Sequence, residues 1–191
     1  MKKNQIRGGL APMSPGGMIL GNRIPRDYFI TKGTGESDIT IHAGSYHLAL
    51  KTAGIERANI MTYSSILPGI AKEISKPSIY NHGEVMESIM AVVHGTKGQK
   101  IAAGIIFGRL YDKKTGKKFG GLVCEHNGEY NLSQIKNLLR ASLNELYING
   151  FDKKYDLKQI KLITETFVVN KKHGTALVAL CFTNYVFPII K

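Results

Sequence analysis

The sequence has 191 residues, of which 43% are hydrophobic and 21% charged, proportions typical of one globular domain with a sizeable core. No apolar run approaches the roughly 18 residues of a membrane span, and no continuous apolar segment follows the basic N-terminus. We therefore expect a cytoplasmic protein with no membrane partner. The formal net charge is +12, but the lysine pairs lie at predicted turns without interleaved aromatic residues, so a nucleic-acid partner is not expected.

The first segment, residues 1–26, is basic and rich in glycine and proline, a composition that resists a packed core. We predict a flexible arm there and a single domain over residues 27–191. The domain begins with a short strand at Tyr28–Lys32, which the glycine-rich segment Gly33–Asp38 ends as a turn. This segment lacks the Gly-Lys-Ser/Thr ending of a phosphate-binding loop.

A helix is predicted over residues 43–53. Tyr46, Leu50 and Ala53 share one face of it, which would pack against the core. Gly54 follows at the position where glycine commonly ends helices.

The next predicted strand, Arg57–Leu67, carries two adjacent serines, Ser64 and Ser65, and Pro68 stops it. Two hydroxyl groups held in one fixed conformation could take part in cleavage of the chain. By themselves they are weak evidence, because a strand that enters a turn has the same features.

Three further strands are predicted at Val85–His94, Lys100–Leu110 and Phe119–His126. The turns between them, Gly95–Gln99 and Asp112–Lys118, are rich in glycine and lysine. This arrangement predicts an antiparallel meander.

The strongest periodic signal is an amphipathic helix over Asn131–Asn149, with Asn131 or Ser133 as its N-cap and Gly150 beyond its end. Two long strands close the chain, and we predict that they form a hairpin. They span residues 159–169 and 175–187, with a turn at residues 170–174. Helices placed between mostly antiparallel strands indicate an α+β layered sandwich.

Cysteines and histidines offer no metal site. Cys124 and Cys181 lie in apolar strand-like runs, which favours buried reduced thiols. The six histidines have none of the spacings that build metal centres. We therefore expect no metal.

Several motifs together resemble one known family. Asn59 lies six residues before Ser65, a Ser-Ser-Ile-Leu-Pro run follows, and Gly120–Glu125 reads Gly-Gly-Leu-Val-Cys-Glu. This set, in the same order and with similar spacing, resembles the pyruvoyl-dependent arginine decarboxylases. The resemblance implies a four-layer αββα sandwich, and assembly as a homo-oligomer, a trimer or paired trimers, with active sites between protomers.

The resemblance also implies a reaction. Ser65 would attack the carbonyl of Ser64, with Asn59 as a hydrogen-bond donor to the oxyanion. Cleavage would release residues 1–64 and convert Ser65 into a covalent pyruvoyl group, the cofactor for decarboxylation of L-arginine to agmatine. Glu125 would be the proton donor, which requires a pKa raised by burial.

One position departs from the family pattern. Twelve residues before Asn59, where arginine-specific members carry an aspartate for the guanidinium, this sequence has His47. The substrate guanidinium could instead bind another acid, for which Glu36, Asp38 and Glu56 are candidates. Alternatively, the enzyme could act on a different amino acid, or His47 could face solvent or fill the core. A non-catalytic binding subunit is the remaining alternative.

Overall fold

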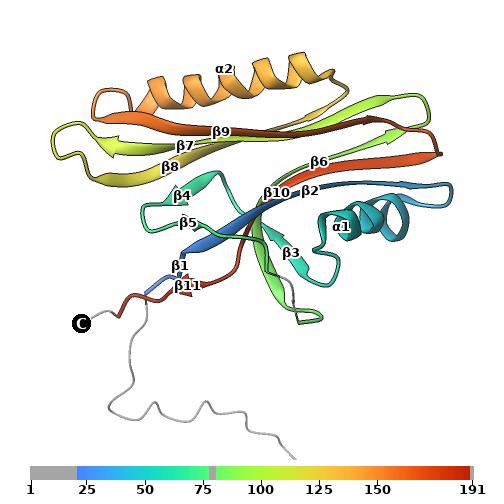
Figure 1. Cartoon of the computed structure of the whole chain (residues 1–191), viewed down its shortest axis with the longest axis horizontal. Coiled ribbons are helices and arrows are strands. Elements are labelled where there is room, and N and C mark those ends of the chain that lie inside the picture. Colours follow the sequence, from blue (N-terminus) through green and yellow to red (C-terminus); the bar gives the residue numbers. More distant parts are fainter. Residues whose placement is uncertain (1–20, 78–80, 190–191) are drawn as a thin grey trace, which may run out of the picture.

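The protein is a sandwich of two sheets with a helix on each outer face. The computed structural model describes residues 21–77 and 81–189. The five-stranded sheet has the order β3-β6-β10-β2-β5 and the four-stranded sheet the order β4-β8-β7-β9. Helix α1 covers the first sheet and α2 the second (Figure 1), which confirms the expected αββα layers.

The helices and strands have the following bounds. The five-stranded sheet consists of β2 (Asp27–Ser37), β3 (Asn59–Thr62), β5 (Lys72–Glu73), β6 (Val85–Thr96) and β10 (His173–Phe182). The four-stranded sheet consists of β4 (Ile66–Pro68), β7 (Lys100–Asp112), β8 (Lys118–Gly128) and β9 (Tyr155–Val168). β1 (Ile24–Pro25) pairs with β11 (Tyr185–Val186). The π-helical turn η1 (Ile41–Tyr46) leads into α1 (His47–Ala53), and α2 spans Leu132–Gly150.

Apolar side chains fill the space between the layers. Ile89, Ile105 and Val178 belong to the cluster between the two sheets. On the outer side of the four-stranded sheet, α2 buries the stripe predicted from its periodicity, including Leu139 and Leu143. Burial of such side chains is the main favourable contribution to folding.

The start of α2 confirms one of the two predicted caps. The Asn131 side chain accepts a hydrogen bond from the Gln134 N–H (3.0 Å), and the Gln134 side chain accepts one from the Asn131 N–H (2.8 Å). This capping box satisfies two backbone donors that the first helical turn leaves free. Gly150 is the last residue of the helix rather than the residue after it.

The predicted strand pairings need correction. β6 and β7 do not form a hairpin, because the turn between them carries the chain from one sheet to the other. The same is true of β9 and β10, which were predicted to pair. β7 and β10 are buried on both faces, so they lack the alternation that would indicate their partners.

The single strand predicted at Arg57–Leu67 is also wrong. β3 pairs with β6 in one sheet, whereas β4 pairs with β8 in the other. The chain therefore crosses between the sheets at residues 63–65, which include the serine pair.

The glycine-rich segment after Lys32 is not a turn but the continuation of β2. A Cβ atom on Gly33 would lie 2.2 Å from the Ala49 carbonyl oxygen, and one on Gly35 would lie 2.2 Å from that of Ser45. The glycines thus let the helical segment 41–53 approach the sheet closely.

Substitution of Gly35 by alanine is expected to lower the free energy of unfolding by about 1–3 kcal/mol, because the contact is with helix backbone that cannot rotate away. Urea unfolding measures this change. As a control, Gly150→Ala meets no atom within 4 Å and is expected to raise the stability by about 0.5–1 kcal/mol. Wild-type stability of the Gly35 variant would contradict the packing role.

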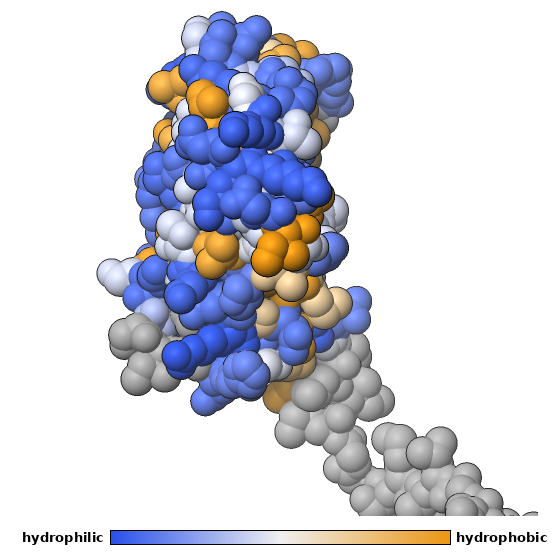
Figure 2. All heavy atoms as spheres, turned by 90° about the vertical axis from the view of Figure 1, so that its right-hand side faces the viewer, coloured by the Kyte–Doolittle hydropathy of each residue, from blue (hydrophilic) through white to orange (hydrophobic). Residues whose placement is uncertain are grey.

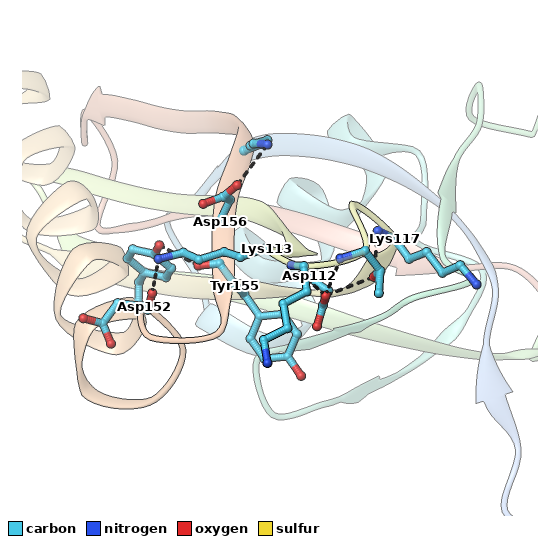
Figure 3. Close-up of polar contacts among 10 residues, drawn as sticks. Asp112, Lys113, Lys117, Asp152, Tyr155 and Asp156 are labelled. Atoms are coloured by element: carbon cyan, nitrogen blue, oxygen red, sulfur yellow. Dashed lines mark hydrogen bonds and ion pairs between the residues drawn. The ribbon is translucent and has the colours of Figure 1, made fainter.

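The turn between β7 and β8 lies where Asp112–Lys118 was predicted. The Asp112 carboxylate accepts hydrogen bonds from the N–H groups of Lys114 (3.0 Å) and Thr115 (2.8 Å). The Lys113 ammonium donates to the Asp152 carbonyl oxygen (2.6 Å), and Figure 3 shows how these residues bring the turn against the end of α2. The hydrogen bonds from Thr115 and Lys114 lower the pKa of Asp112.

The predicted arm, residues 1–26, lies mostly outside the described residues. Its last part does not stand free, since β1 pairs with β11 and the Gly21 N–H donates to the Pro188 carbonyl oxygen (2.7 Å). Within the described residues, neither helix combines the length and the apolarity needed to cross a membrane.

Candidate active site

The serine pair lies on the crossing between the two sheets, and backbone hydrogen bonds hold it on both sides. The Tyr63 N–H donates to the Ser88 carbonyl oxygen on β6 (2.8 Å). The Ser65 carbonyl oxygen accepts from the Val123 N–H on β8 (3.1 Å). The peptide between Ser64 and Ser65 is thus held in place by strands from two different sheets.

Ser65 contacts an acidic side chain that is 60 residues away in the sequence. Its hydroxyl donates to the Glu125 carboxylate at 2.6 Å, and both side chains are partly buried. Burial raises the pKa of Glu125 above its usual value, while the hydrogen bond from Ser65 and the nearby His126 oppose that rise. A carboxylate in this position can take the proton of the Ser65 hydroxyl.

The carbonyl group of Ser64 also has a partner. Its oxygen accepts a hydrogen bond from the Ile66 N–H (2.8 Å), which closes a tight turn centred on Ser65. A backbone N–H that holds this oxygen would stabilise negative charge developing on it. This donor has no sequence signature, because any residue except proline could supply it.

A buried acid lies next to the serine pair. Glu87, on β6, is 1% exposed and accepts hydrogen bonds from the Tyr63 hydroxyl and from Arg23, with which it forms an ion pair. Tyr63 immediately precedes the serine pair, so this network fixes the chain on its N-terminal side. The sequence interpretation missed Glu87, although an acid inside the apolar strand around Met86 and Ile89 is a usable signal.

Asn59, the predicted donor to the oxyanion, is exposed at the start of β3. Its side-chain amide donates to the Gly83 carbonyl oxygen at 2.8 Å. In this arrangement the amide holds the loop that leads into β6.

Two of the three acids proposed for the guanidinium bind the backbone of this chain. Glu36 accepts hydrogen bonds from the N–H groups of Asn170 (2.5 Å) and Lys171 (3.2 Å), and Asp38 accepts one from that of Lys172 (3.1 Å). They close the loop between β9 and β10 at the end of the sandwich drawn at the right of Figure 1. Figure 2 views the molecule from that side, where hydrophilic residues predominate around a small hydrophobic patch.

Within one chain these acids are far from the serine pair. Glu36 pairs with Gly174 on β10, whereas the serine pair is anchored to β6 opposite Cys181, seven residues further along. At about 3.3 Å per residue, roughly 23 Å separates them. His47 is exposed at the first position of α1, and Glu56 lies just beyond that helix.

No group of three or more histidine, cysteine or acidic side chains in residues 21–77 and 81–189 is arranged to hold a metal ion. Cys124 and Cys181 are both free thiols. Burial raises the pKa of Cys124 to about 11 and that of Cys181 to about 12, so neither is a reactive thiolate at neutral pH.

Comparison with known proteins shows the family of this chain. The family model described as pyruvoyl-dependent arginine decarboxylase matches residues 27–187. The chain belongs to this family. The pyruvoyl-dependent arginine decarboxylases AaxB of Chlamydia trachomatis serovar L2 and of Chlamydia abortus are each 31% identical to it over 192 residues, which cover 88% of this chain and 95% of each relative. Pyruvoyl-dependent arginine decarboxylase 2 of Archaeoglobus fulgidus is 31% identical over 111 residues, or 56% of this chain and 67% of the relative.

Family membership confirms the enzyme class expected from the sequence, a pyruvoyl-dependent amino-acid decarboxylase, and with it a covalent pyruvoyl cofactor. The residues around position 65 fit such a group. A serine is the residue from which it is made, and here its hydroxyl lies at 2.6 Å from a carboxylate while its carbonyl oxygen is held by Val123.

Proposed function

We propose that this chain is a self-processing arginine decarboxylase, which cuts itself between Ser64 and Ser65 and converts L-arginine to agmatine and carbon dioxide. The observation that carries the proposal is the 2.6 Å hydrogen bond from the Ser65 hydroxyl to Glu125, which joins a nucleophile to a base at the bond to be cut. Membership of the family supports both the chemistry and the substrate.

In the first step, Ser65 Oγ attacks the carbonyl carbon of Ser64 while Glu125 takes the hydroxyl proton. The Ile66 N–H, which already holds the Ser64 oxygen, stabilises the negative charge that develops there. The C–N bond then breaks as the nitrogen of residue 65 takes the proton from Glu125, so that an ester replaces the peptide bond. Asn59 is the candidate second donor, because its NH2 group has two N–H bonds and the contact with Gly83 uses one of them.

The second step cleaves the chain. Loss of the Cα hydrogen of residue 65 as a proton to water and breakage of its Cβ–O bond form a Cα=Cβ double bond and release Ser64 as the carboxylate end of residues 1–64. Water then replaces the nitrogen of residue 65, which leaves as ammonia. Residues 65–191 retain a pyruvoyl group at their new N-terminus.

A pyruvoyl group supplies an electron sink for the loss of carbon dioxide from an amino acid. Glu125 supplies the proton that the substrate α-carbon takes up afterwards. Because burial raises the pKa of this carboxyl, it stays protonated to a higher pH than an exposed glutamate would.

Within one chain, the residues proposed to bind the substrate lie far from the serine pair. Glu36, Asp38 and His47 lie at the other end of the sheet from Ser65, and the two acids already bind backbone N–H groups. We therefore propose a trimer or a pair of trimers acting in the cytoplasm, in which the serine pair of one protomer meets substrate-binding residues of its neighbour. His47 motivates the second candidate, the same chemistry on an amino acid other than arginine.

Intact-mass measurement of the purified protein tests self-processing. Two fragments that divide after Ser64 are expected, with residues 65–191 carrying a pyruvoyl N-terminus. A lone full-length species after long incubation would contradict the proposal and favour the non-catalytic binding subunit. Carbon dioxide release from a panel of amino acids tests the substrate, and a clear preference for one other than arginine would support the second candidate.

A further inference from the structure

A cavity of about 370 Å³ opens at the end of the sandwich where the β7–β8 hairpin approaches β5, at the left of Figure 1. Neither Ser65 nor Glu125 lines it. Its polar lining consists almost entirely of hydrogen-bond donors: Tyr28, Lys72, Arg109, Lys118, Gln159 and Lys161. Its size falls in the range of small-molecule sites.

One lining residue, Arg109, is a buried cation without a counter-charge. Arg109 is 7% exposed, and no carboxylate of the described residues lies within ion-pair distance of it. One guanidinium nitrogen, Nη2, donates to the Tyr28 hydroxyl (2.7 Å), whereas Nη1 has no partner among those residues. An unpaired buried guanidinium destabilises a fold, so a site that keeps one is suited to a ligand that supplies the missing negative charge.

The surrounding charges have the same sign. Lys72, Lys118 and Lys161 line the cavity with Arg109, and the single carboxylate there, Glu73, is ion-paired with Lys161. The cavity lining therefore carries an excess of positive charge. Burial lowers the pKa of Lys118, and the charge of Arg109 lowers it further.

The backbone is distorted at this cavity. Gln159 has φ = 53°, the one positive φ outside glycine in the described residues, and it lies where the register of β7 and β9 shifts, next to Gly108. Its side-chain oxygen accepts a hydrogen bond from the Tyr111 hydroxyl (3.2 Å), which leaves its NH2 group free to donate. Strained residues and bulges of this kind occur preferentially at ligand sites.

We propose that this cavity binds phosphate, either free or as the phosphate group of a small molecule. The donors come from several strands, and a tetrahedral phosphate presents acceptor oxygens in several directions, with up to two negative charges at neutral pH. A monocarboxylate would match neither the number of donors nor the charge. The site is separate from the decarboxylase chemistry and does not depend on it.

Inorganic phosphate is the probe. The whole protein is titrated with phosphate at constant ionic strength made up with chloride, and binding is followed by the thermal midpoint and by 31P line width. A saturable rise of the midpoint with phosphate is expected, and none with chloride. The proposal would be overturned if phosphate had no saturable effect on the midpoint. It would also be overturned if malonate raised the midpoint as much as phosphate does, because that result indicates a dicarboxylate site.

Lys118→Met separates a binding role from a structural one. It should weaken phosphate binding by about tenfold or more, because a charge-assisted contact is lost, while the thermal midpoint in chloride changes little, because Lys118 is exposed and solvent screens its charge. Lys117→Met removes the same charge from the adjacent turn residue, which does not line the cavity and whose side chain extends away from the turn in Figure 3. It should bind phosphate as the wild type does. Unchanged affinity of the Lys118 variant would overturn the assignment.

Discussion

Ser65→Ala is expected to remain one chain of 191 residues and to have no decarboxylase activity. Alanine has no Oγ, so the carbonyl of Ser64 has no neighbouring nucleophile and the pyruvoyl group cannot form. Intact-mass measurement over several days, together with carbon dioxide release, checks both parts. The fold should persist, because the main backbone contacts of the crossing, from Tyr63 to Ser88 and from Val123 to residue 65, do not use the hydroxyl.

The control for this variant is Ser75→Ala, which removes an exposed hydroxyl from the same part of the chain. It should be processed at the wild-type rate. Cleavage after residue 64 in the Ser65 variant would show that another group attacks this bond, and the mechanism would then be wrong.

Glu125→Gln is expected to slow both self-cleavage and turnover by about 10²–10⁴-fold, the usual contribution of general acid–base catalysis. Glutamine can still accept a hydrogen bond from Ser65, so the geometry is kept, but it can neither take the hydroxyl proton nor return one to a substrate carbon. Time courses of fragment formation give the first rate, and carbon dioxide release by protein that has been processed gives the second.

The pH profiles of the two reactions should run in opposite directions. Self-cleavage requires the carboxylate of Glu125, so its rate should rise as the pH increases through the raised pKa. Turnover requires the protonated carboxyl, so its rate should fall through that pKa. Loss of the Ser65 hydroxyl on processing removes one hydrogen bond that lowers this pKa, which extends the active range of the processed enzyme upward.

Glu129→Gln serves as the matched control, since it changes an exposed acid just beyond the same strand. Both rates should be unaffected. The Glu125→Gln variant could instead be cleaved at the wild-type rate but be inactive in turnover. Glu125 would then not be the base in self-cleavage, and only its role as proton donor to the substrate would remain.

Local sequence signals predicted the elements that depend on local interactions. The period of α2 could be read directly, because a helix buries one stripe, and its cap could be narrowed to Asn131 or Ser133, because the first turn needs nearby acceptors. The approximate positions of β6, β7 and β8 followed for a similar reason, since glycine and lysine mark their turns. Asn59, Ser65 and Glu125 were selected from a sequence motif, which suggests a type of chemistry but does not show where the side chains lie.

What the sequence by itself determined, then, is the class of layered fold and the two helices, and it supplied the serine pair as a hypothesis. The tertiary structure decided which strands share a sheet. Strands that are buried on both faces lack the alternation of apolar and polar residues that would indicate their partners. It decided that the glycines of β2 serve helix packing, that Glu125 meets Ser65, and that Arg109 is buried without a counter-charge. Each of these depends on contacts between segments that are distant in the sequence, and such contacts cannot be inferred from a short stretch of residues.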